Sequence, residues 1–234
     1  MSGFADWIAL VASTSKGIGA GIAQRLATEG TMAVFTYASS KAVAIRADVT
    51  KEDGVVWLAQ EIRQKFGRLD VLVNDARLHD MALCDRQSVS ESNRHFDTNV
   101  LELPLVTREA AGLFPATGAS IVAINSVIST LAPPGSVIHV ATKGAVAPIT
   151  KVLAKVLAPR KIRINSVNPG MAETEGTQSA DFAGGEFEAQ ALAMMPLGRI
   201  RAPDYIAPAF ALLASDEASS IIGETLIVSG GMGM

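Results

Sequence analysis

The sequence predicts one α/β domain built on a doubly wound parallel sheet. Short aliphatic or β-branched runs alternate with longer helical patterns along the whole chain, which is typical of parallel strands joined by right-handed helical crossovers. The 234 residues suffice for one well-buried domain and are too few for two of ordinary size. Since no repeat, low-complexity tract or linker interrupts the pattern, residues 1–234 are expected to form one unit.

The expected elements follow the hydrophobic pattern in chain order. Strands are predicted near 7–11, 32–37, 43–47, 70–73, 119–124, 161–166 and 225–228. Helices are predicted near 18–29, 51–66, 89–113, 137–157 and 203–214. Thr50 is expected to cap the second helix and Gly67 to end it.

The connection between the second and third strands is unusually short. Only residues 38–42 separate them, whereas parallel neighbours need a crossover of at least about 10–12 residues. Either the crossover helix is missing, or a segment was left out of the numbering. A true deletion would require an extended link or a reversed third strand.

Composition excludes several classes of function. The net charge of −3 provides no basic surface for nucleic acid. We expect no stretch to be long and charge-free enough to span a bilayer, and the N-terminal residues show no basic segment with a cleavage site, so a cytoplasmic protein without membrane contact is expected. The single Cys84 cannot form an internal disulfide, and neither it nor His79 and His95, interpreted as surface or loop residues, indicates a metal site.

A glycine-rich turn follows the first strand, over Ala12-Ser13-Thr14-Ser15-Lys16-Gly17-Ile18-Gly19. Such a turn lets backbone N–H groups and a helix N-terminus approach a dinucleotide pyrophosphate. By itself the pattern also fits an ordinary strand-to-helix turn. Ser13 would be strained wherever the turn requires a positive φ.

Further segments follow the later strands at regular intervals. They are Ala47-Asp48-Val49, Asn74-Asp75-Ala76-Arg77, Asn168-Pro169-Gly170 with Thr174, and Ser229-Gly230-Gly231. Ser126, His139 and Lys143 are spaced thirteen and four residues apart, and Asn99 lies in the predicted helix 89–113. Together these segments resemble the short-chain dehydrogenase/reductase family, whose catalytic tyrosine is replaced here by His139. The sequences of these segments are most similar to those of the family's β-ketoacyl-carrier-protein reductase and glucose-dehydrogenase-like branch.

The resemblance implies a Rossmann-like fold and a dinucleotide cofactor. The cofactor contacts that it implies are Ser13, Ser15, Lys16, Gly17, Ile18, Gly19, Asp48, Val49, Asn74, Ala76, Lys143, Pro169, Gly170 and Thr174. Asp75 and Arg77 depart from the family's Asn and Gly, and Arg77 would either turn outward or crowd the ribose. Because the second strand ends without Asp or Glu and Lys16 precedes Gly17, NADP(H) is preferred over NAD(H). Lys41 and Arg46 would add positive potential, although Lys16 is equally interpretable as a solvated turn lysine.

The resemblance also implies a modified catalytic tetrad of Asn99, Ser126, His139 and Lys143. Ser126 would hold the substrate oxygen, Lys143 the nicotinamide ribose, and Asn99 a proton relay. Histidine titrates near 6.5 and suits acid or base chemistry at neutral pH. However, imidazole is shorter than a phenol and Lys143 disfavours its charged form. The alternative is that His139 merely fills the space of the lost tyrosine.

Two regions bear on substrate and assembly. Residues 171–201, with Phe182, Phe187, Leu192, Met194 and Met195, are interpreted either as a mobile lid over an apolar pocket or as a short packed helix. Pro148 lies inside the predicted helix 137–157, where proline removes a hydrogen bond at a cost of about 3 kcal/mol. Relatives form homotetramers or homodimers, partly through this helix.

The sequence therefore predicts NADP(H)-dependent reduction of a ketone or 3-oxoacyl-type carbonyl, with activity lowered by His139. The small-molecule substrate and the direction of the reaction stay open. A second hypothesis is a cofactor-binding regulator or other non-redox protein on the same scaffold. A third is an isomerase or cyclase that uses His139 as acid or base.

Overall fold

The computed structural model describes residues 4–12, 17–35, 43–75, 78–174, 185–200 and 202–233. Its sheet has seven strands in the order β3-β2-β1-β4-β5-β6-β7, and each neighbouring pair is parallel. The strands are β1 Ile8–Ala12, β2 Met32–Phe35, β3 Val43–Ala44, β4 Val71–Asn74, β5 Ala119–Ile124, β6 Ile162–Pro169 and β7 Thr225–Val228. The predicted doubly wound, Rossmann-like α/β fold is confirmed.

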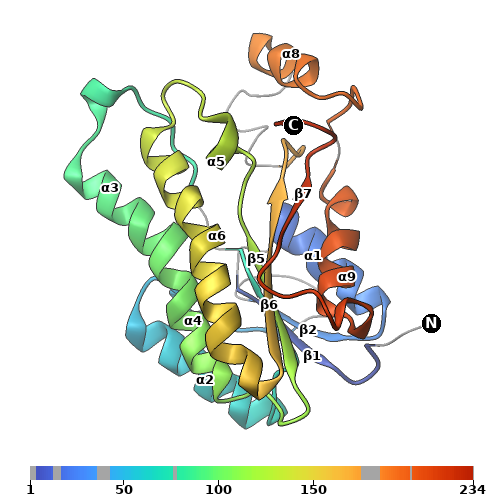
Figure 1. The fold of residues 1–234 in the computed structure, drawn as a ribbon. Helices are drawn as coiled ribbons and strands as arrows, with labels where there is room; N and C mark the ends of the chain where they lie inside the picture. The colour runs from blue at the N-terminus through green and yellow to red at the C-terminus, as the bar shows by residue number, and fades with distance from the viewer. Residues whose placement is uncertain are drawn as a thin grey trace.

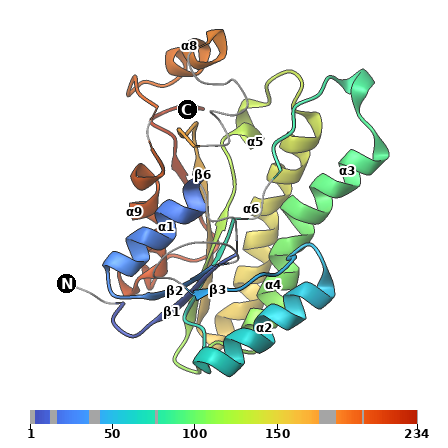
Figure 2. The same ribbon diagram turned by 180° about the vertical axis from the view of Figure 1, so that it is seen from behind.

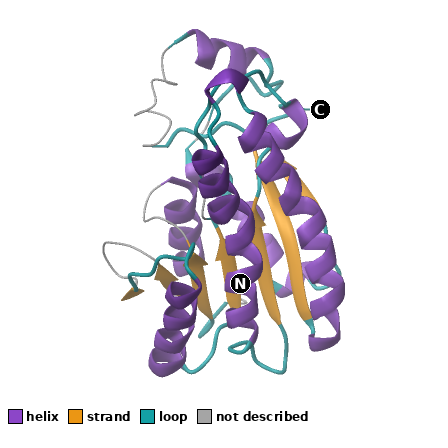
Figure 3. Ribbon diagram, turned by 90° about the vertical axis from the view of Figure 1, so that its left-hand side faces the viewer, coloured by secondary structure: helices purple, strands orange, loops and turns teal. Residues whose placement is uncertain are grey.

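Helices cover both faces of the sheet (Figures 1 and 3). The helices are α1 Gly17–Thr28, α2 Glu52–Phe66, α3 Val89–Phe96, α4 Glu102–Ala111, α5 Ile128–Leu131, α6 Val137–Leu157, α8 Glu186–Ala193 and α9 Ala207–Ala214. α1 and α9 lie on one face, and α2, α4 and α6 lie on the other. The short helix α5 was not predicted from the sequence, whereas α8 lies within residues 171–201, where a short packed helix was one of the two interpretations.

The central strand β1 shows why the sheet is buried on both faces. Ala9 and Val11 point into the core beneath α1 and α9, whereas Leu10 and Ala12 point into the core beneath α2, α4 and α6. All four residues are 2% exposed or less. A strand covered on both sides reads as a continuous apolar run, because every side chain meets a helix layer.

β3 lies at the edge of the sheet and runs parallel to β2 (Figure 2). The register pairs Val34 with Val43, so the alternative of a reversed third strand is wrong. β3 is also shorter than the predicted 43–47. The link itself, residues 36–42, falls outside the described residues.

The segment predicted as one helix over 89–113 is divided by a wider turn. A π-helical segment, Asp97–Leu101, separates α3 from α4. π segments inside α-helices occur frequently at functional sites. Here the segment contains Asn99, one of the predicted catalytic residues.

The ends of α2 confirm one predicted cap and correct the other. Gly67 adopts the left-handed conformation with φ 74° and its N–H donates to the carbonyl of Arg63. At the other end the N-cap is Lys51, not Thr50. The Thr50 hydroxyl donates instead to Asp48 Oδ1 over 2.6 Å, which ties the turn after β3 to the start of the helix.

α6 corrects the expectation that no segment is apolar and long enough to cross a membrane. Residues Val137–Arg160 meet that test by length and composition alone. However, α6 packs along the sheet beside β6 and carries the buried Lys143, as a core helix of this fold would. The helix continues through the exposed Pro148, which deprives the carbonyl of Gly144 of its usual donor.

Candidate active site

The four predicted catalytic residues come from three elements at the carboxyl edge of the sheet. Ser126 follows the end of β5, Asn99 lies in the π segment, and His139 and Lys143 occupy the first turns of α6. The upper end of α6 and the adjoining α5 lie at this edge (Figure 1). In an open parallel sheet, ligands bind outside the carboxyl ends of the strands.

Lys143 reaches from α6 to the end of β5. Its ammonium donates to the carbonyl oxygen of Ile124 over 3.1 Å, and the residue is only 2% exposed. A buried lysine requires hydrogen-bond acceptors, and this one places a fixed positive charge directly beside the strand that leads to Ser126.

Asn99 and His139 meet at the backbone of Leu78. The Asn99 side chain accepts from the Leu78 N–H at 2.7 Å and donates to the Leu78 carbonyl at 2.9 Å. His139 Nδ1 lies 2.9 Å from the same carbonyl. Asn99 Nδ2 also donates to Thr142 Oγ1, and that hydroxyl donates to the His139 carbonyl. Asn99 therefore helps to hold the imidazole through the backbone.

The surroundings of His139 keep its imidazole neutral. Burial, and next the positive charge of Lys143, lower its pKa to about 4 against the opposing effect of the Leu78 hydrogen bond. His79 and His95 act in the same direction as Lys143. His95 is itself buried, with Nδ1 2.9 Å from the Glu91 carbonyl, so its interpretation as a surface or loop residue is wrong.

Ser126 is half-buried and its side chain serves the local turn. Its Oγ accepts from the backbone N–H of Ile128 over 3.2 Å. This bond fixes the Oγ at the start of α5 and leaves the hydroxyl hydrogen available for another acceptor.

Unsatisfied amides at the same edge fit a polar ligand. The side chains of Asn74, Asn125 and Asn168 end β4, β5 and β6 and are at most 5% exposed. Within the described residues, each has a buried amide oxygen without a hydrogen-bond partner, and Asn74 also has an unpartnered Nδ2. Buried polar groups are normally paired. Their position matches the place where a nicotinamide dinucleotide would lie, so the chain's own residues fit that cofactor.

Two glycines provide the close approaches that a dinucleotide site requires. Gly17 begins α1 with φ 62°, a conformation that favours glycine. At Gly170, a Cβ would lie 2.8 Å from the Cα of Ser229, so only glycine fits between β6 and the turn after β7. Gly17, at the start of α1, and Thr174, in the segment after β6, line one cavity of about 990 Å³.

The other predicted cofactor contacts lie in the first turn of α1, at the end of β6 and after β3, or outside the described residues. Ile18 and Gly19 are buried in the first turn of α1, and Pro169 is the last residue of β6. Asp48 and Val49 follow β3, where Asp48 Oδ1 accepts from both the N–H and hydroxyl of Thr50. Several predicted positions lie outside the described residues, namely Ser13, Ser15, Lys16, Lys41, Ala76, Arg77 and Phe182.

A buried acidic group beside Lys143 was missed in the sequence. Glu102 opens α4 and is 3% exposed, and its Oε1 has no hydrogen-bond partner among the described residues. Burial raises the pKa of Glu102 well above its usual value. The positive charge of Lys143 opposes this rise in pKa, and the negative charge of Asp75 adds to it. A usable signal was present, because residue 102 follows Asn99 by three positions and shares its helix face.

Part of the predicted lid packs on the end of the chain. Met195 and Ala191 form a small apolar cluster with Val127 and Met232. The N–H of Leu197 donates to the carbonyl of Gly230, where a Cβ would meet Met195 at 2.9 Å. Met194 is exposed, and residues 175–184 fall outside the described part of the chain.

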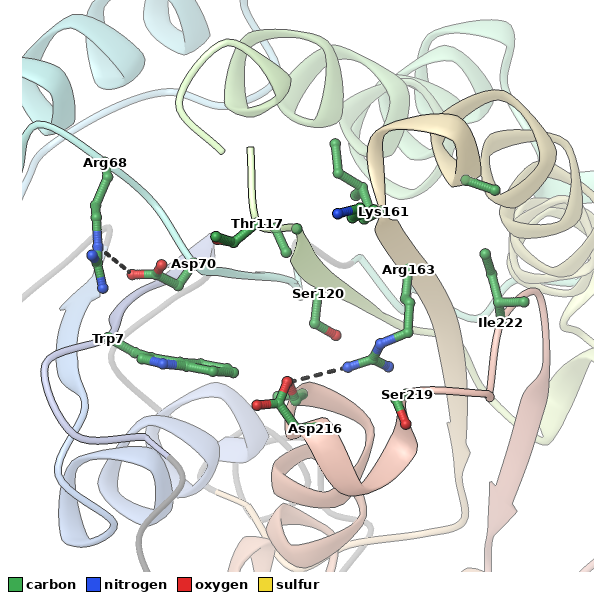
Figure 4. Close-up of a pocket in the computed structure, with 15 residues that line it drawn as sticks. Trp7, Arg68, Asp70, Thr117, Ser120, Lys161, Arg163, Asp216, Ser219 and Ile222 are labelled. Carbon is green, nitrogen blue, oxygen red and sulfur yellow. Dashed lines mark hydrogen bonds and ion pairs between the residues drawn. The ribbon is translucent and has the colours of Figure 1, made fainter. Parts of the chain in front are cut away.

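A second large cavity lies at the opposite edge of the sheet (Figure 4). Its volume is about 590 Å³, and Trp7, Asp70 and Arg163 line it near the amino ends of strands. The Arg163 guanidinium donates to the carbonyls of Leu213, Ala214 and Ser215, which end α9. Asp70 accepts from Ile8 N–H and from Arg68. These polar groups therefore stabilise the scaffold, away from the predicted catalytic residues.

Comparison with known proteins agrees with this geometry. The family described as "Enoyl-(Acyl carrier protein) reductase" matches residues 12–233. An uncharacterized oxidoreductase of Methylorubrum extorquens is 42% identical over 248 aligned positions, which cover 99% of this chain and 100% of that protein. The 3-oxoacyl-[acyl-carrier-protein] reductase of Staphylococcus aureus is 35% identical, covering 97% of this chain and 98% of that one.

Solved structures of dehydrogenases are also similar to this chain over nearly its whole length. The ligand-free aldohexose dehydrogenase of Thermoplasma acidophilum has a TM-score of 0.91 at 29% identity, covering 99% of this chain and 95% of its own. A short-chain dehydrogenase/reductase of Serratia marcescens has the same TM-score at 30% identity, with 99% of both chains covered. With a family match over nearly its whole length, relatives above 30% identity and this site, the chain belongs to the short-chain dehydrogenase/reductase family of oxidoreductases.

Proposed function

We propose that this oxidoreductase uses NADP(H) to reduce a ketone or 3-oxoacyl-type carbonyl to the alcohol, and that His139 makes the reduction slow. The observation that carries the proposal is the buried Lys143, whose ammonium is fixed at the end of β5 beside Ser126. The similarity to a 3-oxoacyl reductase supports the substrate class.

Each group of residues has a separate task in this proposal. The N-terminus of α1 at Gly17 would hold the pyrophosphate, and Lys143 the nicotinamide ribose. Pro169, Gly170 and Thr174 would hold the carboxamide. When bound, the cofactor supplies the hydride that is exchanged with the substrate carbon. Ser126 would orient the substrate oxygen by donating a hydrogen bond to it.

Reduction also requires a proton at the new alcohol oxygen. A neutral His139 whose Nδ1 proton is held by Leu78 has no second proton to give. General acid catalysis typically contributes about 10²–10⁴ in rate, so the lack of a ready acid supports the low activity proposed.

The preference for NADP(H) rests on charge in the sequence. No acidic residue lies between Phe35 and Ser40, where an acid would bind the 2′-hydroxyl of NAD. Lys16 and the exposed Arg46 provide positive charge for a 2′-phosphate.

Cofactor binding tests the proposal first. The purified chain is titrated with NADPH and with NADH while nicotinamide fluorescence is followed. Lys143→Met should weaken NADPH binding at least ten-fold, whereas Lys151→Met, at an exposed position of α6, should not. If the parent chain binds neither nucleotide, the redox proposal fails and a non-redox role on this scaffold replaces it.

We also propose that the chain works as a homotetramer or homodimer in the cytoplasm, with residues 171–201 as a substrate lid. Val152 and Val156 on α6 are 61% and 64% exposed, and Leu226 and Ile227 on the edge strand β7 are 39% and 48% exposed. Apolar surface of this kind supports self-association. Light scattering on the purified chain measures the mass of the assembly, and a monomer would contradict this part of the proposal.

A further inference from the structure

We propose that the site is matched to the hydroxyl form of its substrate: His139 Nε2 accepts a hydrogen bond from a secondary alcohol, and Asn99 positions the imidazole for this task. The inference rests on the proposed function and assigns the substrate form that the resting site recognises. It gives Asn99 a positioning role that acts through the backbone of Leu78.

The partner of His139 determines where its proton lies. A carbonyl oxygen can only accept, so the 2.9 Å contact with Leu78 requires the hydrogen to be on Nδ1. A neutral imidazole has one N–H, so Nε2 carries a lone pair. No hydrogen bond to Nε2 is present within the described part of the chain.

Asn99 fixes the Leu78 peptide that selects this tautomer. Its amide bonds both the N–H and the carbonyl of Leu78, at 2.7 and 2.9 Å. Such a two-point contact sets the direction of the Leu78 carbonyl. Asn99 is 4% exposed and its Nδ2 is also tied to Thr142, so the side chain is itself immobilised.

The charges around His139 favour the neutral form. Lys143 lies one turn along α6, His79 is in the segment with Leu78, and His95 is on α3, and all three disfavour a second proton on His139. The nearby acids are directed to other groups. Asp80 lies 3.9 Å from His95 Nε2 and also pairs with Arg94, while Glu102 and Asp75 belong to the cluster around Lys143.

Ser126 supplies the complementary group. Its Oγ accepts from Ile128 N–H, and its hydroxyl hydrogen, which has no acceptor among the described residues, can be donated to a ligand. One acceptor at His139 and one donor at Ser126 match an alcohol, which can donate to Nε2 and accept from Oγ. A ketone oxygen has no hydrogen and would present its lone pairs to the lone pair of Nε2. A 3-hydroxyacyl compound or similar secondary alcohol should therefore bind more tightly than its ketone.

Nuclear magnetic resonance of the full chain with ¹⁵N-labelled histidine tests the tautomer. Long-range proton–nitrogen correlation at neutral pH should show His139 protonated on Nδ1 and unprotonated on Nε2. His79→Gln and His95→Gln identify the other two imidazoles. Asn99→Ala should mix the tautomers of His139, whereas Asn93→Ala, at an exposed site on α3, should leave them unchanged. A proton on Nε2 in the parent chain would overturn the inference.

Binding measurements test whether the site prefers the alcohol to the ketone, as the inference requires. The protein is saturated with the tetrahydronicotinamide analogue of NADP, which cannot exchange hydride, and titrated with ethyl 3-hydroxybutyrate and ethyl acetoacetate. The alcohol should bind roughly ten-fold tighter, the effect of one unmatched polar contact. Asn99→Ala should reduce this ratio without changing the affinity for the analogue. Tighter binding of the ketone would overturn the inference. If no nicotinamide nucleotide binds, the proposed function fails, while the tautomer measurement still decides this inference.

Discussion

The imidazole of His139 donates from Nδ1 to the backbone carbonyl of Leu78 over 2.9 Å. The two residues are far apart in the sequence, one in the segment after β4 and the other in the first turn of α6. Their contact leaves Nε2 as the unprotonated nitrogen of the neutral ring. The reactivity of the site at a given pH should follow from it.

Replacement of His139 by tyrosine should accelerate carbonyl reduction. A phenol retains its proton through neutral pH, while the imidazole, with a pKa lowered to about 4, has no second proton to give. We expect kcat/KM for reduction of a ketone panel to rise by about 10²-fold at pH 8, within the range of general acid catalysis.

The pH profile distinguishes this explanation from a simple repair of packing. Above pH 4, reduction by the parent chain should fall about ten-fold per pH unit, whereas His139→Tyr should be nearly flat up to the phenol's titration. Trp57→Tyr, at an exposed position of α2, adds a phenol away from His139; it is the control and should behave like the parent. An unchanged rate in His139→Tyr across the panel would show that the missing phenol does not limit turnover.

The same imidazole should make the fold sensitive to acid. His139 titrates near 6.5 when unfolded and near 4 when folded, so between these values the unfolded chain binds the additional proton. The contribution of His139 to the free energy of unfolding is about 3 kcal/mol; it is therefore complete above pH 6.5 and is lost as pH falls towards 4. Urea unfolding at pH 7 and pH 4.5 should show a smaller loss for His139→Gln than for the parent, and equal losses would contradict the assignment.

Glu102 should make the stability of the fold depend on pH in the opposite direction to His139. Burial raises the pKa of this carboxyl, so the folded chain holds a proton that the unfolded chain releases, and stability falls as pH rises above the unfolded value. The slope is at most about 1.4 kcal/mol per pH unit for one proton. Glu102→Gln should remove this slope, so its advantage over the parent should widen from pH 5 to pH 8. Glu109→Gln, on the outer part of α4, is the matched control; a constant difference between Glu102→Gln and parent would contradict this role.

Gly170 should not tolerate even a methyl group. A Cβ there would lie 2.8 Å from Ser229 Cα, and backbone cannot yield as a flexible side chain can. Gly170→Ala should destabilise the fold by about 1–3 kcal/mol and weaken NADPH binding, because β6 and the closing turn must separate. Gly144→Ala, in α6, meets nothing within 4 Å and should stabilise by about 0.5–1 kcal/mol. Thermal unfolding measures both, and equal shifts would contradict the packing argument.

Much of the fold could be predicted because its signals are local. The apolar runs of β1 and β5, and the alternation of Ile162 and Ile164 with polar residues in β6, gave strand positions to within a few residues. The resemblance of their spacing to the active site of the short-chain dehydrogenase/reductase family also indicated that Ser126, His139 and Lys143 share an edge, where strand ends and helix starts meet.

The remaining details depend on contacts between distant segments. The hydrogen bonds that Leu78 forms with Asn99 and with His139 join three separate segments, and nothing in the local sequence around Leu78 indicates them. The burial of Glu102 and His95 likewise depends on how α3 and α4 lie against the rest of the fold. Polar side chains inside helical patterns look exposed until the packing is known.

The π segment Asp97–Leu101 also sets the rotational phase of the helices on either side. Each α-helical residue turns the chain by about 100°, so one added residue in a wide turn shifts every later side chain by that angle. Deleting a single residue there would let the helix close into regular α form. If the deleted residue is Val100 or Leu101, Asn99 and Glu102 come to lie two positions apart, about 200° around the helix, and can no longer both face inward. Such a deletion would alter the site more than most substitutions.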